Sequence, residues 1–305
     1  MTKHTLTLTG LDGANPLAFL AALGTFRIMA ETETHQATAL AWTNAGNRWT
    51  PVLYLSRPTT ADDLITILDG PLRTMSDHTV LTFAQNLRIP ALQFRSLSID
   101  ALNGWMNGED TISHRFLSAF GSDGIRSENG EIEDTALRTM SGAGHQHFLK
   151  FMNDLAVETT SENLSEALFG PWRYQDPGPS LRFDPEDDRR YALRWKNPSQ
   201  DAATTVRGAN RLAVEAIPFF PAFPVNGRLE NTGFTGHKSN DTFWTWPIWE
   251  HPIDCEVCRS LLALSNLANP APDLSELRPR GIVATFRTQR ITVGKFRNFT
   301  PARAV

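Results

Sequence analysis

The sequence contains little cysteine, with only two such residues among 305. Two thiols cannot supply the disulfide framework on which many small secreted domains depend. No run approaches the 18 consecutive apolar residues that predict a membrane-spanning helix. The first ten residues, MTKHTLTLTG, also lack the apolar centre of a secretory signal. These absences predict a cytoplasmic protein with no membrane partner, and the 41% apolar content is ample for a large core.

Acidic residues are missing from the end of the chain, where none follows Glu276. Residues 1–170 carry 11 Lys/Arg and 19 Asp/Glu, whereas residues 171–305 carry 18 and 14. A basic segment of this kind suits a phosphate backbone or an acidic protein surface, and a solvated basic tail is the alternative. The basic residues of this segment are Arg278, Arg280, Arg287, Arg290, Lys295, Arg297 and Arg303.

Familiar catalytic signatures are also missing. The sequence has no Walker loop, dinucleotide fingerprint, GxSxG elbow or HExxH motif, so a familiar hydrolase is disfavoured and no cofactor is predicted. His145 and His147 could share a metal ion, but their neighbourhood in sequence offers no evident third ligand. Together with Asp123 or Asp134, the two histidines could form a metal-dependent nuclease or hydrolase, and this alternative remains open.

Cysteine and tryptophan each occur in one notable cluster. Cys255 and Cys258 form a single CxxC pair at a predicted helix start, and without a second pair they indicate buried thiols. The segment DTFWTWPIWEH, residues 241–251, places three tryptophans near one another. Such aromatics stack nucleic-acid bases in some proteins, but burial in a hydrophobic core is the interpretation we favour for these three.

Periodicity predicts an α+β fold with mixed sheets and packed helices. The chain opens with alternating residues typical of a strand, turns at Gly10, and continues into a helix with Asn15 as N-cap and Pro16 at its first position. Further strands are predicted at 37–43, 50–55, 79–84 and 191–195. Further helices are predicted at 60–68, 112–120, 145–155, 208–217 and 255–267.

A proline-rich stretch at residues 171–185 predicts a division into two lobes, an N-terminal α+β lobe of residues 1–170 and a C-terminal lobe of residues 171–305. The last thirty residues alternate apolar and polar positions on both sides of Thr288-Gln289. They predict a basic β-hairpin that turns at this dipeptide.

The opening segment LTGLDGANPLAFLAALGTFRIMAE, residues 8–31, resembles the start of CRISPR-associated proteins of the type I-G group, formerly I-U. The likeness rests on a strand, a glycine turn and a Pro-Leu helix that contains Leu20 and an Ala-Leu-Gly run ending at Gly24. Residues 116–124, 135–149, 190–199 and 207–224 are similar to the same family. Together these segments cover about a third of the chain.

This resemblance implies a non-catalytic subunit of a Cascade-like, RNA-guided defence complex, in a position related to the large subunit. Its expected partners are other subunits of the effector complex and guide RNA or target DNA. The resemblance implies that the protein contacts mainly the sugar-phosphate backbone of the nucleic acid. A protein-interaction module that binds no nucleic acid is a further alternative. The predicted nucleic-acid contacts are Arg278, Arg280, Arg287, Arg290, Lys295 and Arg297 on the hairpin segment, with Arg138, His145, His147, Arg207 and Arg211 on a second surface.

Overall fold

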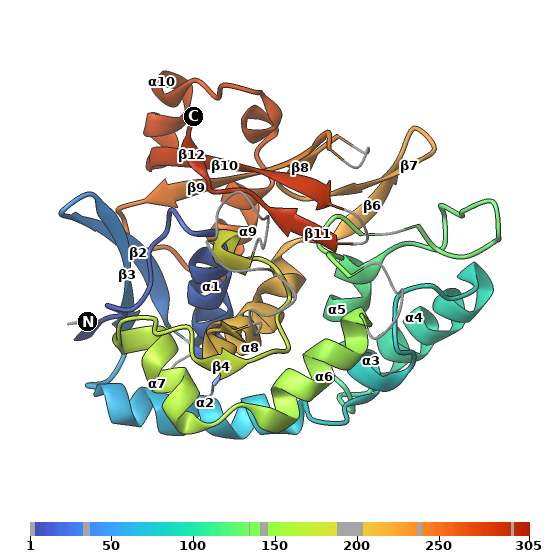
Figure 1. Ribbon diagram of the computed structural model, residues 1–305, viewed down its shortest axis with the longest axis horizontal. Helices are drawn as coiled ribbons and strands as arrows, with labels where there is room; N and C mark the ends of the chain where they lie inside the picture. The colour runs from blue at the N-terminus through green and yellow to red at the C-terminus, as the bar shows by residue number, and fades with distance from the viewer. Residues whose placement is uncertain are drawn as a thin grey trace.

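The computed structural model describes residues 4–32, 37–133, 135–140, 146–187, 204–236, 240–293 and 296–305. Figure 1 shows helix α1 at the centre, a twisted sheet above it, and further helices below and to one side. The α-helices are α1 (Pro16–Glu31), α2 (Ala61–Thr74), α3 (Thr79–Thr82), α4 (Ala91–Met106), α5 (Ser113–Phe120), α6 (Phe148–Glu158), α7 (Ser161–Phe169), α8 (Arg207–Ala216), α9 (Cys255–Leu262) and α10 (Leu274–Leu277). The strands are β1 (His4–Thr7), β2 (Ala39–Ala45), β3 (Arg48–Leu55), β4 (Asp176–Pro177), β5 (Thr204–Thr205), β6 (Ala222–Val225), β7 (Arg228–Asn231), β8 (Phe234–Thr235), β9 (Thr242–Trp249), β10 (Ile282–Val293), β11 (Phe296–Phe299) and β12 (Arg303–Ala304).

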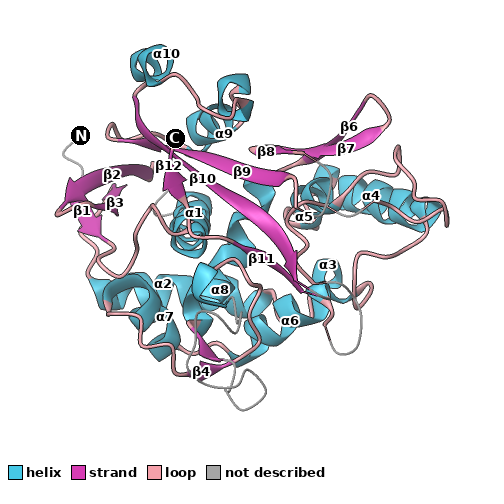
Figure 2. Cartoon of the chain, turned by 45° about the horizontal axis from the view of Figure 1, so that its top comes forward, coloured by secondary structure: helices cyan, strands magenta, loops and turns pink. Residues whose placement is uncertain are grey.

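The predicted α+β class is confirmed, and the strand pairs of the described residues are antiparallel. The largest sheet has the order β11-β10-β9-β8, and β12 also pairs with β10. A second sheet has the order β1-β3-β2. Figure 2 shows the long strand β10 crossing above α1 and α8, so the sheet covers one side of the central helices.

Helix α1 forms the centre of the core. Its N-cap Asn15 accepts a hydrogen bond from the Ala18 amide, as the sequence predicts. Residues 16–29 are all buried, because the helix is surrounded by other elements rather than lying on the surface. A Cβ atom built on Gly24 would lie 1.9 Å from the Leu212 carbonyl oxygen, so the absence of a side chain there allows α1 and α8 to pack closely.

The three tryptophans of β9 are core residues. Trp244, Trp246 and Trp249 are fully buried, and the ring of Phe19 from α1 contacts all three. The Trp246 indole donates to the Gly13 carbonyl at 2.8 Å, so this side chain joins the sheet to the turn before α1. Packing, rather than base stacking, therefore explains this aromatic cluster.

The two cysteines lie at the start of α9, and both are free thiols. Cys258 is fully buried and Cys255 is partly buried. Burial raises the pKa of the Cys255 thiol to about 12 and that of Cys258 well above its usual range. Both thiols therefore stay protonated near neutral pH, as expected of structural cysteines.

Several local predictions are confirmed and one is wrong. Thr60 caps α2 with a capping box completed by Asp63. The predicted strand at 79–84 is instead the short helix α3, whose N-cap His78 accepts from the Val80 amide through Nδ1. The predicted strand at 191–195 lies outside the described residues. Helices α4 and α7 were not predicted from the sequence.

The predicted lobes share a single hydrophobic core. Helix α8 belongs to the predicted C-terminal lobe, whereas α1 and α7 belong to the predicted N-terminal lobe, which ends at residue 170. Nevertheless, α8 packs against both α1 and α7. The arrangement in Figure 1, with α8 beside α1 and below the sheet, agrees with these contacts. The proline-rich stretch is therefore a connection across one core, because apolar side chains from both sides of it pack together.

The basic hairpin is present, but its predicted turn is wrong. Strand β10 runs unbroken through Thr288 and Gln289, where both residues pair with β9, and the chain returns only as β11. In the described part of the chain, no helix has both the length and the apolar character required to cross a membrane.

Candidate functional site

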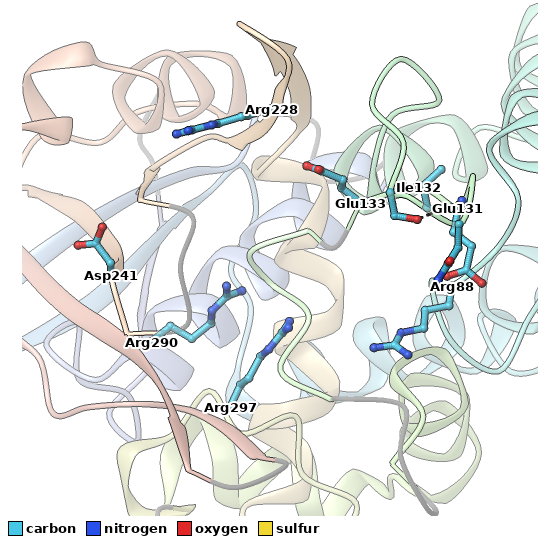
Figure 3. A pocket seen from close by; sticks show the side chains of 10 residues that line it. Arg88, Glu131, Ile132, Glu133, Arg228, Asp241, Arg290 and Arg297 are labelled. Atoms are coloured by element: carbon cyan, nitrogen blue, oxygen red, sulfur yellow. Dashed lines mark hydrogen bonds between the residues drawn. The ribbon is translucent and has the colours of Figure 1, made fainter.

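An open cleft of about 640 Å³ lies between the end of the large sheet, the β6-β7 hairpin and the loop that follows α5, with Arg88 contributed from the segment before α4. Figure 3 shows Arg88, Arg290 and Arg297 directed toward the same space, with Arg228 along its edge. The segments that form the cleft are distant in sequence and meet only in the folded chain. The lining residues are Arg88, Ser127, Asn129, Glu131, Ile132, Glu133, Arg228, Asp241, Arg290 and Arg297.

Arg290 and Arg297 form the inner wall of the cleft. In the antiparallel pair β10-β11, Thr292 lies opposite Arg297, so Arg290 and Arg297 share one face of the sheet. The Arg290 guanidinium donates to the Ala136 carbonyl at 2.7 Å and to Thr242 Oγ1 at 3.3 Å. Arg297 donates to the Arg138 carbonyl at 3.2 Å. These bonds hold both guanidinium groups against residues 135–140 and fix their orientation.

Arg88 and Arg228 lie at the mouth of the cleft. Both side chains are exposed, and neither forms an ion pair with another residue in the described ranges. Each therefore presents its guanidinium to solvent and can bind an incoming anion.

Three carboxylates share the cleft with the four arginines. Glu131 and Glu133 lie on the loop wall, and Asp241 lies beside the sheet. Glu133 accepts a hydrogen bond from the Leu229 amide at 3.3 Å, which ties the loop to β7. The four guanidinium groups and three carboxylates among the lining residues give a formal charge of +1.

This lining favours a ligand that combines anionic groups with hydrogen-bond donors. Guanidinium groups bind phosphate through paired N–H donors, and carboxylates accept from hydroxyl and amino groups. A nucleotide chain carries both kinds of group. The lining residues include no aromatic side chain, so the cleft provides no platform for stacking bases.

Four of the predicted contact arginines are buried, namely Arg138, Arg211, Arg287 and Arg290, and among these four only Arg290 lines the cleft. Arg138 is fully buried and donates to Asn86. Arg211 is fully buried and binds Glu215 at 2.6 Å and the Leu72 carbonyl at 2.9 Å. Arg287 lies over the Phe243 ring and donates to the Asn269 carbonyl, and burial lowers the pKa of its guanidinium. We therefore remove Arg138, Arg211 and Arg287 from the predicted interface.

Arg278 and Arg280 are exposed but lie away from the cleft. They precede β10, whereas Arg290 lies near its other end, about 30 Å away at the usual rise of a strand. Arg207, at the start of α8, is largely buried and binds the Pro177 carbonyl and Glu158. The predicted basic surface is therefore divided among separate places, and of its described members only Arg290 and Arg297 line the cleft.

The predicted histidine pair is described only in part. His147 is half-buried before α6, and its Nδ1 has no hydrogen-bond partner among the described residues. His145, Lys295 and Asp134 lie outside the described residues. Asp123 pairs with Arg95, and the described ranges contain no cluster of three metal-binding side chains.

A smaller hollow of about 450 Å³ lies near the start of α1. Asp12, Arg48 and Trp172 are among its lining residues. Near it, the buried carboxylate of Asp184 accepts hydrogen bonds from Asn15 and Tyr174, at 3.1 and 3.0 Å. Burial raises the pKa of Asp184 above its usual value, although these hydrogen bonds act in the opposite direction.

Comparison with known protein families, curated proteins and solved structures finds no match for this chain. The functional interpretation therefore rests on the residues of the chain and their arrangement. Sequence reasoning missed Arg88 and Arg228, because each is isolated in sequence and no local pattern associates it with the C-terminal segment.

Proposed function

We propose that this chain is a non-catalytic, nucleic-acid-binding subunit of an RNA-guided antiviral defence complex in the cytoplasm. Its resemblance to the type I-G CRISPR group supports this assignment, as does the arginine-lined cleft. The proposed partners are the other subunits of the complex and a guide RNA or its DNA target. Within this assembly, the cleft contacts the nucleic-acid backbone.

The observation that carries the proposal is the convergence of four arginines from three segments that are distant in sequence: the loop with Arg88, strand β7 with Arg228, and the β10-β11 hairpin with Arg290 and Arg297. Arg290 and Arg297 are held in place by main-chain carbonyls, while Arg88 and Arg228 extend into solvent at the mouth. A polyanion fits an arrangement in which the guanidinium groups of the inner wall are held in place and those at the mouth are exposed. The fixed groups define its path, and the exposed groups attract it through longer-range electrostatics.

The test is a binding measurement with labelled 20-nucleotide RNA, the same sequence as single-stranded DNA, and a DNA duplex. The variant Arg88→Ala/Arg228→Ala removes two exposed charges without breaking a hydrogen bond in the described part of the chain. The control Arg278→Ala/Arg280→Ala removes the same net charge at the other end of β10. Fluorescence anisotropy at several salt concentrations gives both the affinity and the salt slope.

We expect the cleft variant to bind more weakly, with a shallower salt slope. For single strands, the slope should decrease by about 1.4, since each lost phosphate contact contributes about 0.7. The control should keep the slope of the unmodified protein. Equal losses in the two variants would indicate a general charge effect, and unchanged binding in the cleft variant would refute the proposed interface.

A further inference from the structure

Helix α4 presents large apolar side chains to solvent. Five of the nine exposed large hydrophobic residues in the described part of the chain lie on this single helix. They are Leu92 (65% exposed), Ile99 (51%), Leu102 (48%), Trp105 (50%) and Met106 (75%). Contiguous apolar surface of this kind marks interaction sites, whereas single exposed apolar residues need no explanation.

The side of α4 that faces the protein is less bulky than the side that faces solvent. Its buried residues are Ala91, Phe94 and Ala101, two of which are alanines, and the partly buried Leu97 also packs against the core. Figures 1 and 2 both place α4 at the outer edge of the molecule, beside α5. For an isolated protein this orientation is unfavourable, because burial of aliphatic side chains supplies most of the packing energy of a helix.

The exposed residues have the spacing of a helix-packing seam. Leu92, Ile99 and Met106 are seven residues apart, and Leu102 lies three residues after Ile99. These are the a and d positions of a heptad, which place apolar side chains along one face for knobs-into-holes packing with a second helix. Arg95 occupies the remaining d position within the seam.

Charge and area together indicate what covers this face. Arg95 pairs with Asp123 through its Nε atom, and its side chain stays 53% exposed. A single paired cation, with Asp100 nearby, does not give the positive excess that a nucleic acid or an acidic membrane surface requires. A 16-residue helix is about 24 Å long, so one helix contact covers less than the roughly 800 Å² per partner of a stable dimer.

We infer that α4 is a docking face for an amphipathic helix of another protein subunit. The partner helix carries an aliphatic seam at heptad spacing and a carboxylate opposite Arg95. The contact is one part of an assembly that other contacts also hold together, because it is too small to support a stable pair by itself. This inference does not depend on nucleic acid binding in the cleft.

The test introduces the photoreactive residue p-benzoylphenylalanine at Ile99 in the full chain. This chain is co-expressed with the products of the genes that flank its own, irradiated, and analysed by mass spectrometry. The matched control carries the same group at Gln93, an exposed position on another side of α4. A second experiment tests Arg95→Glu alone. A third combines Arg95→Glu with the opposite charge change at the partner residue that the crosslink identifies.

We expect a crosslink from position 99, and not from position 93, to an apolar seam on a partner helix. Arg95→Glu should abolish it, and a Glu→Arg or Asp→Arg change at the facing partner residue should restore it. A crosslink to nucleic acid, a crosslink to a second copy of this chain, or no crosslink would each overturn the inference. RNA binding by the Leu92→Ser/Ile99→Ser variant should stay normal, so failure of the docking face and failure of the cleft can be distinguished.

Discussion

The packing of α1 against α8 makes Gly24→Ala a severe test of the core. A Cβ atom at this position would lie 1.9 Å from the Leu212 carbonyl oxygen and 3.1 Å from Glu215 Cβ. The atom in the way is a main-chain carbonyl oxygen of α8. Rotation of a side chain cannot relieve this clash, so α8 itself must move. Overpacking of this kind costs about 1–3 kcal/mol or more, while alanine in place of glycine within a helix recovers about 1 kcal/mol.

A main-chain clash at 1.9 Å belongs at the upper end of this range, so we expect Gly24→Ala to lower the free energy of unfolding by about 2 kcal/mol after the gain in helix propensity is subtracted. Urea unfolding followed by tryptophan fluorescence measures this directly, because the tryptophans Trp42, Trp244, Trp246 and Trp249 are buried. With a urea dependence of about 3 kcal/mol/M, the midpoint falls by about 0.7 M.

The control is Gly70→Ala in α2, where an added Cβ meets no heavy atom within 4 Å outside the neighbouring residues. Its change should stay within about 1 kcal/mol, since the gain in helix propensity is offset by crowding against Pro71. Stability of Gly24→Ala equal to that of the unmodified protein would refute the close approach of α1 and α8.

Two further predictions concern buried charges. Glu215 accepts from both Arg27 and Arg211 in the core. Glu215→Gln removes the carboxylate beside the buried Arg211 and leaves Arg27 paired with Glu31 alone, so it should cost about 3–5 kcal/mol in urea unfolding. The exposed pair Lys150–Asp154 provides the comparison, and Asp154→Asn should cost less than about 1 kcal/mol; equal losses would contradict the buried network. The raised pKa of Asp184 means that the folded state holds the carboxyl proton more tightly than the unfolded state. The contribution of Asp184 to stability therefore falls as pH rises from 3.8, the ordinary pKa of aspartate, through the higher pKa of the folded state. Thermal unfolding between pH 4 and 7 should therefore show Asp184→Asn gaining stability relative to the unmodified protein as pH rises, and a constant difference would contradict the raised pKa.

Local chemistry made the first two long helices predictable. The Asn15-Pro16 start of α1 and the Thr60 cap of α2 satisfy backbone donors within a few residues, so the sequence is sufficient to locate them. The segment 79–82, TVLT, is too short and too apolar to distinguish a strand from a helix. Its sequence suits a buried strand and a buried helix equally. Helix α4 was missed because apolar residues lie on both its buried and its exposed side, which weakens the usual amphipathic signal.

The candidate site was only partly predictable for a different reason. Arg290 and Arg297 belong to a visible basic segment, but Arg211 becomes a core residue through Glu215 and a carbonyl of α2. Whether an arginine is paired in the core or exposed at a surface depends on contacts between distant segments. Composition predicts a basic character, whereas only the fold determines which guanidinium groups meet in one cleft.

The most direct measurement of the central claim is the nucleic acid recovered with the chain from cells. The tagged protein is expressed with the products of its neighbouring genes, purified, and extracted for sequencing, in parallel with Arg88→Ala/Arg228→Ala. Our account predicts a bound guide RNA together with partner subunits, and a reduced yield of nucleic acid from the cleft variant. Recovery of the partner subunits with no nucleic acid, or of the same yield from both proteins, would contradict it.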